Sequence, residues 1–314
     1  MKIKKPKFWD LKKTSVISRL LLPFTLPILI NNFLLKFKSN FKNSNIKTIC
    51  VGNIYLGGTG KTPSTIKIYE ILKELNLKVV TAKKFYTSQL DENIVLKNKT
   101  QFISLKSRKE IIKKAIKKGA EVIVFDDGLQ DRNISYDLTF VCFETDTFIG
   151  NGCLIPSGPL REKLNSLIKY DGVFLKTDEN SSNDQLNLIQ KYNPKIEIFE
   201  THFEINNLDR FDLSKNYLIF SGIGNPISFK KILNKNKFNI VKEIIFPDHH
   251  NYTENELRNI SKLAKNLNAK IVTTEKDFVK ISKFEIQNID FINIKLVFKN
   301  ENKIKDFLKK KING

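Results

Sequence analysis

A glycine-rich segment that directly follows a short apolar run carries the residue types in this sequence that are best suited to chemistry. Residues 48–63 read TICVGNIYLGGTGKTP. Glycines let backbone N–H groups turn inward around an anion, and the N-terminus of a following helix adds partial positive charge. In such a loop the lysine reaches the β- and γ-phosphates and the next hydroxyl binds Mg²⁺. We therefore expect a nucleoside triphosphate to bind along Gly57, Gly58, Thr59, Gly60, Lys61 and Thr62.

The spacing in this segment is that of a variant loop. The strict pattern G-x-x-x-x-G-K-[ST] requires a glycine at the position of Tyr55, and the nearest upstream glycine is Gly52. A glycine-rich turn with one exposed lysine, Lys61, is the alternative. The apolar strand before the loop and the helical pattern after it favour the phosphate site, as does Pro63, which suits a first helical turn.

Three further patches place functional groups after expected strands, where open α/β sheets bind their ligands. Residues 125–127, FDD, end a hydrophobic strand with two acids, which suits a Mg²⁺-organising carboxylate unless the acids form only a solvated turn. Residues 150–162 form a loop rich in Gly and Pro that ends in Arg161, a fork for a phosphate, and Glu162, a metal ligand. Residues 246–252, FPDHHNY, join two histidines to a carboxylate and suit proton transfer.

These patches need a scaffold. After residue 46, short β-branched runs alternate with helical stretches, which predicts a mainly parallel, doubly wound α/β sheet. The first set has expected strands at Lys47–Val51, Leu77–Ala82, Glu121–Phe125, Leu138–Phe143 and Gly172–Lys176, and helices near Thr65–Leu75 and Ser107–Lys118. A second, smaller α/β set has expected strands at Tyr217–Ser221, Val241–Phe246 and Lys270–Thr274, and helices near Pro226–Asn234 and Glu254–Asn268.

The order of these elements predicts three consecutive parts. They are an N-terminal segment over 1–45, a phosphate-binding lobe over 46–206 and a second α/β lobe over 207–314. The stretch Lys195–Leu213 is expected to be an extended connector, with a hinge near Asn206. At 314 residues the chain is long enough for two lobes that each bury a core.

Cysteine content and charge narrow the cellular setting. The three cysteines, Cys50, Cys142 and Cys153, form no C-x-x-C pair, so neither a disulfide framework nor a zinc site is indicated and a cytosolic protein is expected. The formal net charge is +21, and residues 1–47 hold eleven Lys or Arg against one acid, Asp10. Such a basic end favours an anionic surface, either nucleic acid or acidic lipid. A general bias toward Lys and Asn is an alternative explanation of the remaining charge.

Apolar residues beside these charges favour lipid. Residues 16–37 read VISRLLLPFTLPILINNFLLKF, and the uncharged run Leu20–Leu35 is shorter than the roughly 20 residues that span a bilayer. The segment lacks a small-residue cleavage site, which argues against a signal peptide. With Trp9 and nearby lysines as an interfacial anchor, we expect a membrane-associated helix that lies in or dips into the cytoplasmic leaflet. A helix packed on the protein's own core is the alternative.

Six motifs in one order carry a family resemblance: VGNIYLGGTGKTP, DDGLQD, GNGCLIPSGPLRE, FSGIGNP, FPDHHNYT and TTEKD. Together they resemble the tetraacyldisaccharide 4′-kinases, enzymes of lipid A biosynthesis with a P-loop NTPase-like fold, and the resemblance covers about Phe8 to Lys280. It implies transfer of the ATP γ-phosphate to the 4′-hydroxyl of tetraacyldisaccharide 1-phosphate, giving lipid IVA at the cytoplasmic face of the bacterial inner membrane. We expect ATP and Mg²⁺ as cofactors, the lipid disaccharide and an anionic membrane surface as partners, no nucleic acid, and a monomer.

The resemblance implies roles position by position. Lys61 acts on the phosphates. Asp91 is the base that accepts the hydroxyl proton, and His249 holds the Asp91 carboxylate in place. A carboxylate can serve as the base because a loose transition state asks little of it beyond position. We favour His249 over His250, since it directly follows Asp248 at the matched position. We expect closure of the two lobes to bring Asp91 and His249 together. The implied metal ligands are Thr62, Asp126, Asp127 and Glu162, and the implied substrate-binding residues are Glu92, Gln130, Asn151, Arg161 and His250.

The chain departs from the family pattern and leaves two other functions open. Residues 81–86 read TAKKFY where the family has Ser-Arg-Gly-Tyr, so Lys83 or Lys84 takes the basic role; the path from there to Asp91 is short, and Asp131 replaces a histidine. A basic P-loop ATPase acting on nucleic acid explains the charge but not the run Leu20–Leu35, and no aromatic and arginine stripe suggests base stacking. A membrane-peripheral nucleotide-binding protein without kinase activity is the other alternative.

Overall fold

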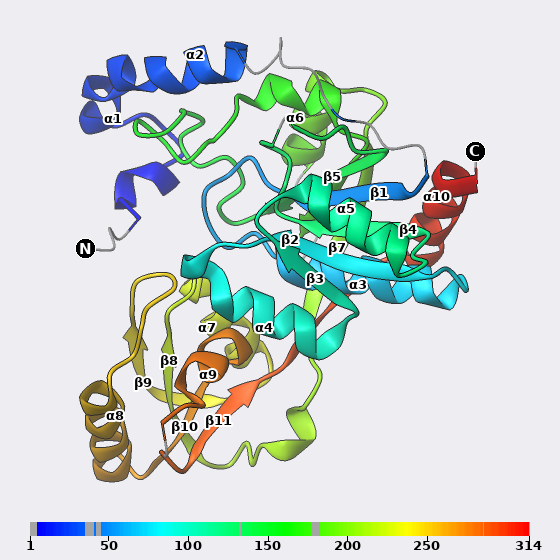
Figure 1. Cartoon of the computed structure of the whole chain (residues 1–314). Coiled ribbons are helices and arrows are strands. Elements are labelled where there is room, and N and C mark those ends of the chain that lie inside the picture. The colour runs from blue at the N-terminus through cyan, green and yellow to red at the C-terminus, as the bar shows by residue number, and fades with distance from the viewer. Residues whose placement is uncertain are drawn as a thin grey trace. The chain divides into compact units, whose positions relative to one another are not determined.

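A computed structural model describes residues 5–34, 41, 45–131, 133–177, 183–284 and 286–313. The chain forms two compact units, and neither is a single continuous stretch (Figure 1). The larger unit contains Lys5–Phe85, Lys99–His202 and Leu296–Gly314, and the smaller unit contains Tyr86–Asn98 and Phe203–Lys295. The part of the predicted N-terminal helix beyond residue 34 lies outside the described residues.

The larger unit is built on an eight-stranded sheet with the order β12-β7-β6-β5-β1-β4-β2-β3. Six neighbouring pairs in this sheet are parallel: β7 with β6, β6 with β5, β5 with β1, β1 with β4, β4 with β2 and β2 with β3. The strands are β1 (Lys47–Gly52), β2 (Val79–Lys84), β3 (Phe102–Leu105), β4 (Val122–Asp126), β5 (Leu138–Glu144), β6 (Gly172–Lys176), β7 (Glu197–Ile205) and β12 (Ile294–Phe298). The strand order reverses at β1, and ligands of open α/β sheets bind at such a switch point.

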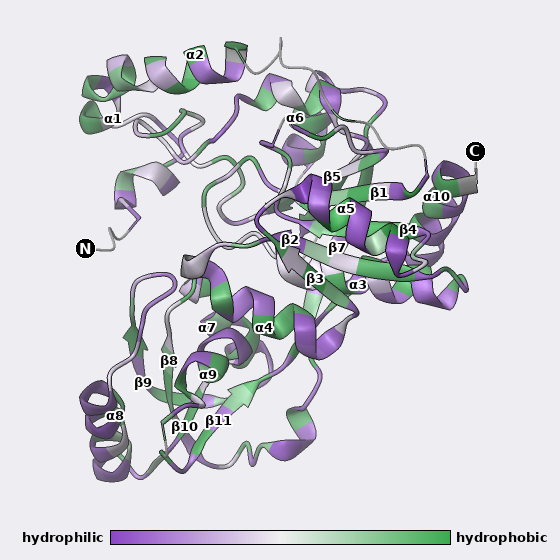
Figure 2. Cartoon of the chain, viewed as in Figure 1, coloured by the Kyte–Doolittle hydropathy of each residue, from purple (hydrophilic) through white to green (hydrophobic). Residues whose placement is uncertain are grey.

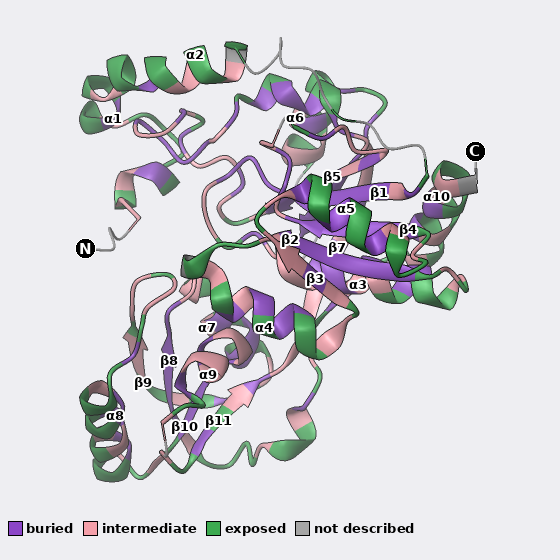
Figure 3. Cartoon of the chain, in the orientation of Figure 1, coloured by how far each residue is buried: buried purple, intermediate pink, exposed green. Residues whose placement is uncertain are grey.

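Helices cover both faces of this sheet because its central strands are apolar on both sides (Figures 2 and 3). On one face, α5 and α6 pack on a core that includes Cys50 and Val141. On the other, α3 and α10 lie side by side and are linked by ion pairs of Lys67 with Glu301 and of Lys305 with Glu74. The helices are η1 (Lys7–Asp10), α1 (Val16–Leu20), η2 (Leu22–Thr25), α2 (Leu26–Leu34), α3 (Lys61–Glu74), α5 (Arg108–Lys117), η5 (Leu164–Lys169), α6 (Asn183–Tyr192) and α10 (Glu301–Asn313).

The smaller unit has a four-stranded sheet with the order β11-β10-β8-β9, in which each neighbouring pair is parallel. One core lies under α8 and α9 and another under α7, so both faces of this sheet are covered as well. The elements are η4 (Thr87–Gln89), α4 (Leu90–Lys99), η6 (Leu208–Arg210), β8 (Asn216–Ser221), α7 (Pro226–Lys235), β9 (Asn239–Ile245), α8 (Glu254–Asn266), β10 (Ala269–Thr274), α9 (Glu275–Ile281) and β11 (Ile289–Ile292).

The predicted α/β class with a mainly parallel, doubly wound sheet and a smaller second lobe is confirmed, and each strand and helix expected after residue 46 is present within four residues of its predicted ends. The single helix expected in the N-terminal segment is instead divided into α1, η2 and α2 over residues 16–34. The predicted connector over Lys195–Leu213 is wrong, because β7 occupies residues 197–205 and pairs with β6 in the larger sheet. The division into consecutive parts also differs from the structure. Residues 86–98 belong to the smaller unit, and residues 296–313 complete the larger one through β12 and α10.

Candidate active site

The loop between β1 and α3 has the backbone geometry of an anion-binding turn. Gly57 and Gly60 adopt φ values of +152° and +81°, which side-chain-bearing residues rarely take. Buried Asn53 fixes the turn, because its Nδ2 donates to Gly57 O at 3.2 Å and to Thr59 Oγ1 at 3.0 Å. Gly60 is the N-cap of α3 and has no side chain to cap the helix, so the first amide groups of α3 are available to an anion.

The first two residues of α3 contact the two acids that follow β4. Lys61 Nζ lies 3.7 Å from Asp127 Oδ2, and Thr62 Oγ1 donates to Asp126 Oδ2 at 3.0 Å. These contacts form because β4 is the direct neighbour of β1, so both strands present their carboxyl ends to the same side of the sheet. The predicted phosphate and acid motifs therefore meet in one place in the larger unit.

Asp126 is fully buried and compensated by hydrogen bonds and by a cation. Its carboxylate accepts from Thr62 and, at 3.5 Å, from Thr65 Oγ1, and it pairs with Lys83 Nζ at 2.9 Å. Lys83 is one of the two lysines expected to take over the family's basic role. A hydroxyl and a carboxylate held together are oxygen donors of the kind that phosphoryl-transfer enzymes offer to Mg²⁺, so Thr62 and Asp126 fit that ion.

Asp127, Arg161, Gln130 and Glu162 form a second polar group beside the loop. Arg161 Nη1 lies 3.2 Å from Asp127 Oδ1 and 3.3 Å from Gln130 Oε1, and Gln130 Nε2 donates to Glu162 Oε1 at 3.1 Å. Glu162 also accepts from Tyr170 at 2.9 Å and pairs with Lys169 at 3.1 Å. Within the described ranges, no three His, Cys, Asp or Glu side chains gather to hold a metal ion.

An acid and a histidine meet in the smaller unit. Asp91, in the first turn of α4, is 4% exposed, and its Oδ2 lies 3.0 Å from His249 Nδ1. His249 is held in a left-handed conformation with φ of +55°, and its backbone N–H donates to Gly222 O at 3.1 Å. The following loop is fixed by the capping box of Thr253 and Glu256 at the start of α8.

The charges around this pair keep Asp91 ionised. Burial by itself would raise the pKa of Asp91, but the hydrogen bond with His249 and the positive charges of Lys276 and Lys280 outweigh it, so the pKa is lowered from its ordinary value. The Nζ atoms of the two lysines lie 3.8 and 3.7 Å from Asp91 Oδ2. Burial would likewise lower the pKa of Lys276, but Glu92, Asp248 and Asp91 raise it. Asp91 is therefore a carboxylate at neutral pH that can accept a proton.

The predicted assembly of this pair by lobe closure is corrected by the structure. Residues 86–98 and 203–295 belong to the same compact unit, so Asp91 and His249 meet within it. The sequence pattern placed Asp91 in the first lobe because it follows β2 directly along the chain. The shortness of the segment between Lys84 and Asp91 hides the crossing into the other unit, which occurs after Phe85.

Two of the implied substrate-binding residues, Asn151 and His250, have contacts within the protein. Asn151 is 8% exposed, and its Nδ2 donates to Ser18 Oγ and to Ser157 O, each at 3.0 Å, which ties the N-terminal segment to the loop 150–160. His250 Nε2 lies 3.1 Å from Glu256 Oε1, and its ring stacks on Phe246 with the centroids 4.6 Å apart. The acid Asp91 thus pairs with His249 rather than with His250.

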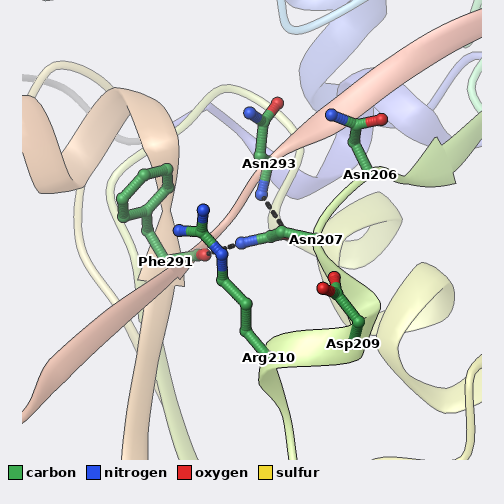
Figure 4. A pocket seen from close by; sticks show the side chains of 6 residues that line it. All are labelled: Asn206, Asn207, Asp209, Arg210, Phe291 and Asn293. Atoms are coloured by element: carbon green, nitrogen blue, oxygen red, sulfur yellow. Dashed lines mark hydrogen bonds between the residues drawn. The ribbon is translucent and has the colours of Figure 1, made fainter.

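A polar pocket of about 190 Å³ in the smaller unit is separate from all these groups (Figure 4). Its centre is Asn207, whose Nδ2 donates to Phe291 O at 2.9 Å and whose Oδ1 accepts from Asn293 N at 3.0 Å. These bonds tie the end of β7 to the link between β11 and β12. The pocket is lined by Asn206, Asn207, Asp209, Arg210, Phe291 and Asn293, and so contains none of the predicted site residues.

Sequence patterns missed three residues that shape the two sites. Asn53 lies inside the first motif, and its short side chain is the kind that fixes a turn. Lys276 and Lys280 were also missed. The motif TTEKD contains Lys276, and a lysine four residues later lies on the same face of a helix, but neither feature points to a partner 184 residues away.

The sequence and fold are similar to those of known proteins. A family model described as tetraacyldisaccharide-1-P 4′-kinase matches residues 18–313. A tetraacyldisaccharide 4′-kinase of Pelagibacter ubique is 47% identical over an alignment of 303 residues, which covers 96% of this chain and 96% of that protein. One from Rickettsia canadensis is 36% identical over an alignment of 333 residues that covers 99% of this chain and 98% of that protein. A crystal structure of LpxK from Aquifex aeolicus in complex with ATP shares the fold, with a TM-score of 0.69 at 23% sequence identity. The superposition covers 95% of this chain and 100% of the LpxK chain.

Proposed function

Because the chain belongs to the tetraacyldisaccharide-1-P 4′-kinase family, we infer that it is a kinase of lipid A biosynthesis with ATP as phosphate donor. In the reaction we propose, the 4′-hydroxyl oxygen of tetraacyldisaccharide 1-phosphate attacks the γ-phosphorus of ATP. The bond from the γ-phosphorus to the bridging oxygen breaks, ADP leaves with that electron pair, and the hydroxyl proton passes to a base. The product is the 1,4′-bisphosphate lipid IVA.

The loop between β1 and α3 binds the triphosphate in this proposal. Its backbone amides and the N-terminus of α3 hold the phosphate oxygens, and Lys61 offsets charge on the transferring group. Thr62 and Asp126 are the residues that would hold Mg²⁺, whose charge would offset the β- and γ-phosphates. Arg161 and Gln130 lie beside the loop and orient a phosphate group, while Glu162 acts through Gln130 and is not a direct metal ligand.

Asp91 is the base, and its contact with His249 at 3.0 Å is the observation that carries this assignment. A buried carboxylate normally becomes less acidic, yet this one is surrounded by cations and stays ionised. His249 orients the carboxylate toward the acceptor hydroxyl and stabilises its charge before transfer. We propose no direct contact of His250 or Asn151 with substrate, since Asn151 Nδ2 and His250 Nε2 already have partners within the protein.

The N-terminal segment supports a membrane-bound position because its polarity is inverted. Ser18 and Thr25 are 0% and 7% exposed, while most of the apolar residues around them are exposed; Figures 2 and 3 show this segment coloured by hydropathy and by burial. These exposed residues are Val16, Ile17, Leu20, Leu22, Phe24, Leu26, Ile30 and Leu34. An apolar surface of this size on a short segment suits burial in the interface of a bilayer. No helix in the part of the chain that the structure describes is long and apolar enough to cross one.

We propose that this segment rests on the cytoplasmic leaflet of the inner membrane, where a lipid substrate and ATP are both accessible. The polar side chains hold it to the protein: Ser18 Oγ donates to Ser157 O at 2.6 Å, and Trp9 Nε1 donates to Pro156 O at 2.9 Å. The lysines near the segment add attraction to anionic lipid. This explanation accounts for both the charge and the apolar surface, whereas a nucleic-acid partner accounts only for the charge.

A direct assay separates the proposed function from the alternatives. Purified protein in detergent is incubated with γ-labelled ATP and, in parallel, with tetraacyldisaccharide 1-phosphate, RNA, DNA or no acceptor. The proposal requires label on the 4′-position of the lipid and on neither nucleic acid. Release of labelled phosphate that is stimulated by RNA or DNA would support the basic ATPase. ATP binding without transfer to any acceptor would support a nucleotide-binding protein without kinase activity.

A further inference from the structure

Two of the six sequence motifs, FSGIGNP and TTEKD, have no role in the reaction described so far. They begin in the last two residues of β8 and β10, which are parallel neighbours, so both motifs lie at the same edge of the smaller sheet. Asp277 joins them: its Oδ2 accepts from Gly222 N at 2.9 Å and from Thr274 Oγ1 at 2.7 Å, and it is fully buried. The two motifs therefore form a rigid base for the helix α9 that begins in TTEKD.

That base fixes Lys280, one turn further along α9. Lys280 Nζ lies 2.6 Å from Asp277 Oδ1, and it also lies 3.7 Å from Asp91 Oδ2. The ammonium group is thus placed by Asp277 and offers a fixed positive charge to Asp91. Lys280 supports the carboxylate but does not touch the imidazole in any contact the structure records.

Lys276 lies close to Asp91 and His249 and also to the two neighbouring acids, Glu92 and Asp248. Its Nζ lies 2.9 Å from Glu92 Oε1, 3.6 Å from Asp248 Oδ1 and 3.8 Å from Asp91 Oδ2. It also lies 3.4 Å from His249 Nε2. This last contact matters most, because an ammonium group has three donors and no acceptor.

We propose that Lys276 is a positioning residue that holds His249 as the neutral tautomer with its proton on Nδ1. A donor that points at Nε2 needs a lone pair there, so the single ring proton must be on the other nitrogen. Nδ1 lies 3.0 and 3.2 Å from the two oxygens of Asp91, which then receive that proton as a hydrogen bond. A proton on Nε2 would instead face the ammonium and leave Nδ1 as an acceptor opposite a carboxylate.

The nearby acids do not reverse this preference. Glu92 Oε1 and Asp248 Oδ1 each lie 3.9 Å from His249 Nε2, beyond hydrogen-bond distance, and would by themselves favour a proton there. Lys276 Nζ lies closer to these same two oxygens than Nε2 does, so its charge offsets theirs. Lys276 thus favours the Nδ1–H tautomer in two ways: it donates to Nε2, and it offsets the charges of the two acids near Nε2.

The consequence for the reaction rests on the proposed function of Asp91 as base. With its proton on Nδ1, His249 donates to Asp91 and leaves the carboxylate as the group that accepts the hydroxyl proton. With the proton on Nε2, a lone pair would face the carboxylate and turn it away from a fixed orientation. Misplacing a catalytic group by such a change costs on the order of a hundredfold in rate.

The test reads the tautomer directly and needs no substrate. The chain has three histidines, so ¹⁵N-histidine labelling gives three imidazole spectra, which His202→Gln and His250→Gln variants assign. At neutral pH the wild type should show a protonated Nδ1 and a bare Nε2 on His249. A wild-type spectrum with the proton on Nε2, or on both nitrogens, would overturn the proposal without any Lys276 variant.

Variants then test the assignment to Lys276. In Lys276→Met the Nδ1–H form should be lost or mixed, and kcat should fall about a hundredfold with little change in KM for ATP. Lys276→Arg keeps a donor and should keep the tautomer, while the exposed Lys262→Met is the surface control. An unchanged tautomer in folded Lys276→Met rejects the role of Lys276. Full activity of Asp91→Ala, by contrast, rejects the proposed base and leaves the tautomer result standing.

Discussion

His249 Nδ1 lies 3.0 Å from Asp91 Oδ2, although 158 residues separate the two in the sequence. The contact exists because the chain enters the smaller unit twice, first for α4 and again after His202. Both side chains are held by further contacts. The backbone N–H of His249 donates to Gly222 O, and Lys276 and Lys280 of α9 lie beside the Asp91 carboxylate. A carboxylate that is held this firmly and stays ionised at neutral pH meets the demand of a loose transition state, which asks little of the base beyond position.

The lowered pKa of Asp91 predicts a specific pH dependence of stability. A carboxylate whose folded-state pKa is depressed stabilises the protein above its unfolded pKa, roughly 3.9, and loses that contribution as the pH falls through the folded value. Urea unfolding of wild type and Asp91→Asn should therefore differ most near pH 6 and converge below about pH 4. Asp290→Asn, at an exposed position of the same unit, is the control. A difference that grows on acidification would contradict the lowered pKa.

Lys61 is expected to act on the transferring phosphate. Lys61→Ala removes a fixed charge aimed at that group, and the loss of one such group costs about a hundredfold or more in kcat. Initial rates with labelled ATP measure it, and Lys67→Ala, on the same helix but away from the loop, is the control. Near-normal turnover of Lys61→Ala would mean that this loop does not bind the nucleotide.

The buried pair of Lys83 and Asp126 predicts a large effect on stability. The two side chains are 1% and 0% exposed, so Lys83→Met leaves the carboxylate of Asp126 without its ammonium partner. Breaking a buried pair from one side costs about 3–5 kcal/mol of unfolding free energy. Adding Asp126→Asn should recover part of that loss, because the unpaired charge is gone. Denaturant unfolding measures both, with the exposed Lys113→Met as the control; equal effects of the two single lysine variants would refute the prediction.

The N-terminal segment predicts binding to anionic vesicles through its exposed apolar side chains. Leu20 and Phe24 are 70% and 65% exposed, so glutamate at both positions should weaken vesicle binding and raise KM for the lipid more than KM for ATP. Ile227→Glu, at a residue of α7 that is 61% exposed, is the matched control. Cosedimentation with vesicles measures the effect. If the double variant binds as wild type does, the membrane contact lies elsewhere.

Local patterns predicted the fold well where the signal was short-range. The elements β1, α3 and β4 follow from apolar runs and glycine chemistry, and parallel pairing then brings Lys61 and Thr62 to Asp127 and Asp126 without further information. The strand β7 was missed because only Phe199 and Thr201 of its residues are buried, so its sequence lacks the continuous apolar run that marks the central strands.

Patterns were insufficient where distant segments determine a residue's surroundings. Nothing local to Asp91 shows that it lies 3.8 Å from Lys276, or that its part of the chain joins the smaller unit. Asn151 and His250 have the residue types of substrate contacts, but no local pattern shows that Asn151 contacts Ser18 or that His250 contacts Glu256. The type of a residue identifies it as a candidate for a site, but its contacts depend on the tertiary fold.

If Asp91 and His249 act as one proton-accepting unit, a double-mutant cycle on kcat should show losses that do not add. Rates of 4′-phosphorylation are measured for Asp91→Ala, His249→Ala and the double variant, with ATP affinity measured separately. We predict that each single change lowers kcat by about a hundredfold or more, that ATP affinity is retained, and that the double variant is hardly slower than the slower single one. Losses that multiply fully in the double variant, or a loss of ATP binding with normal kcat in His249→Ala, would contradict the claim.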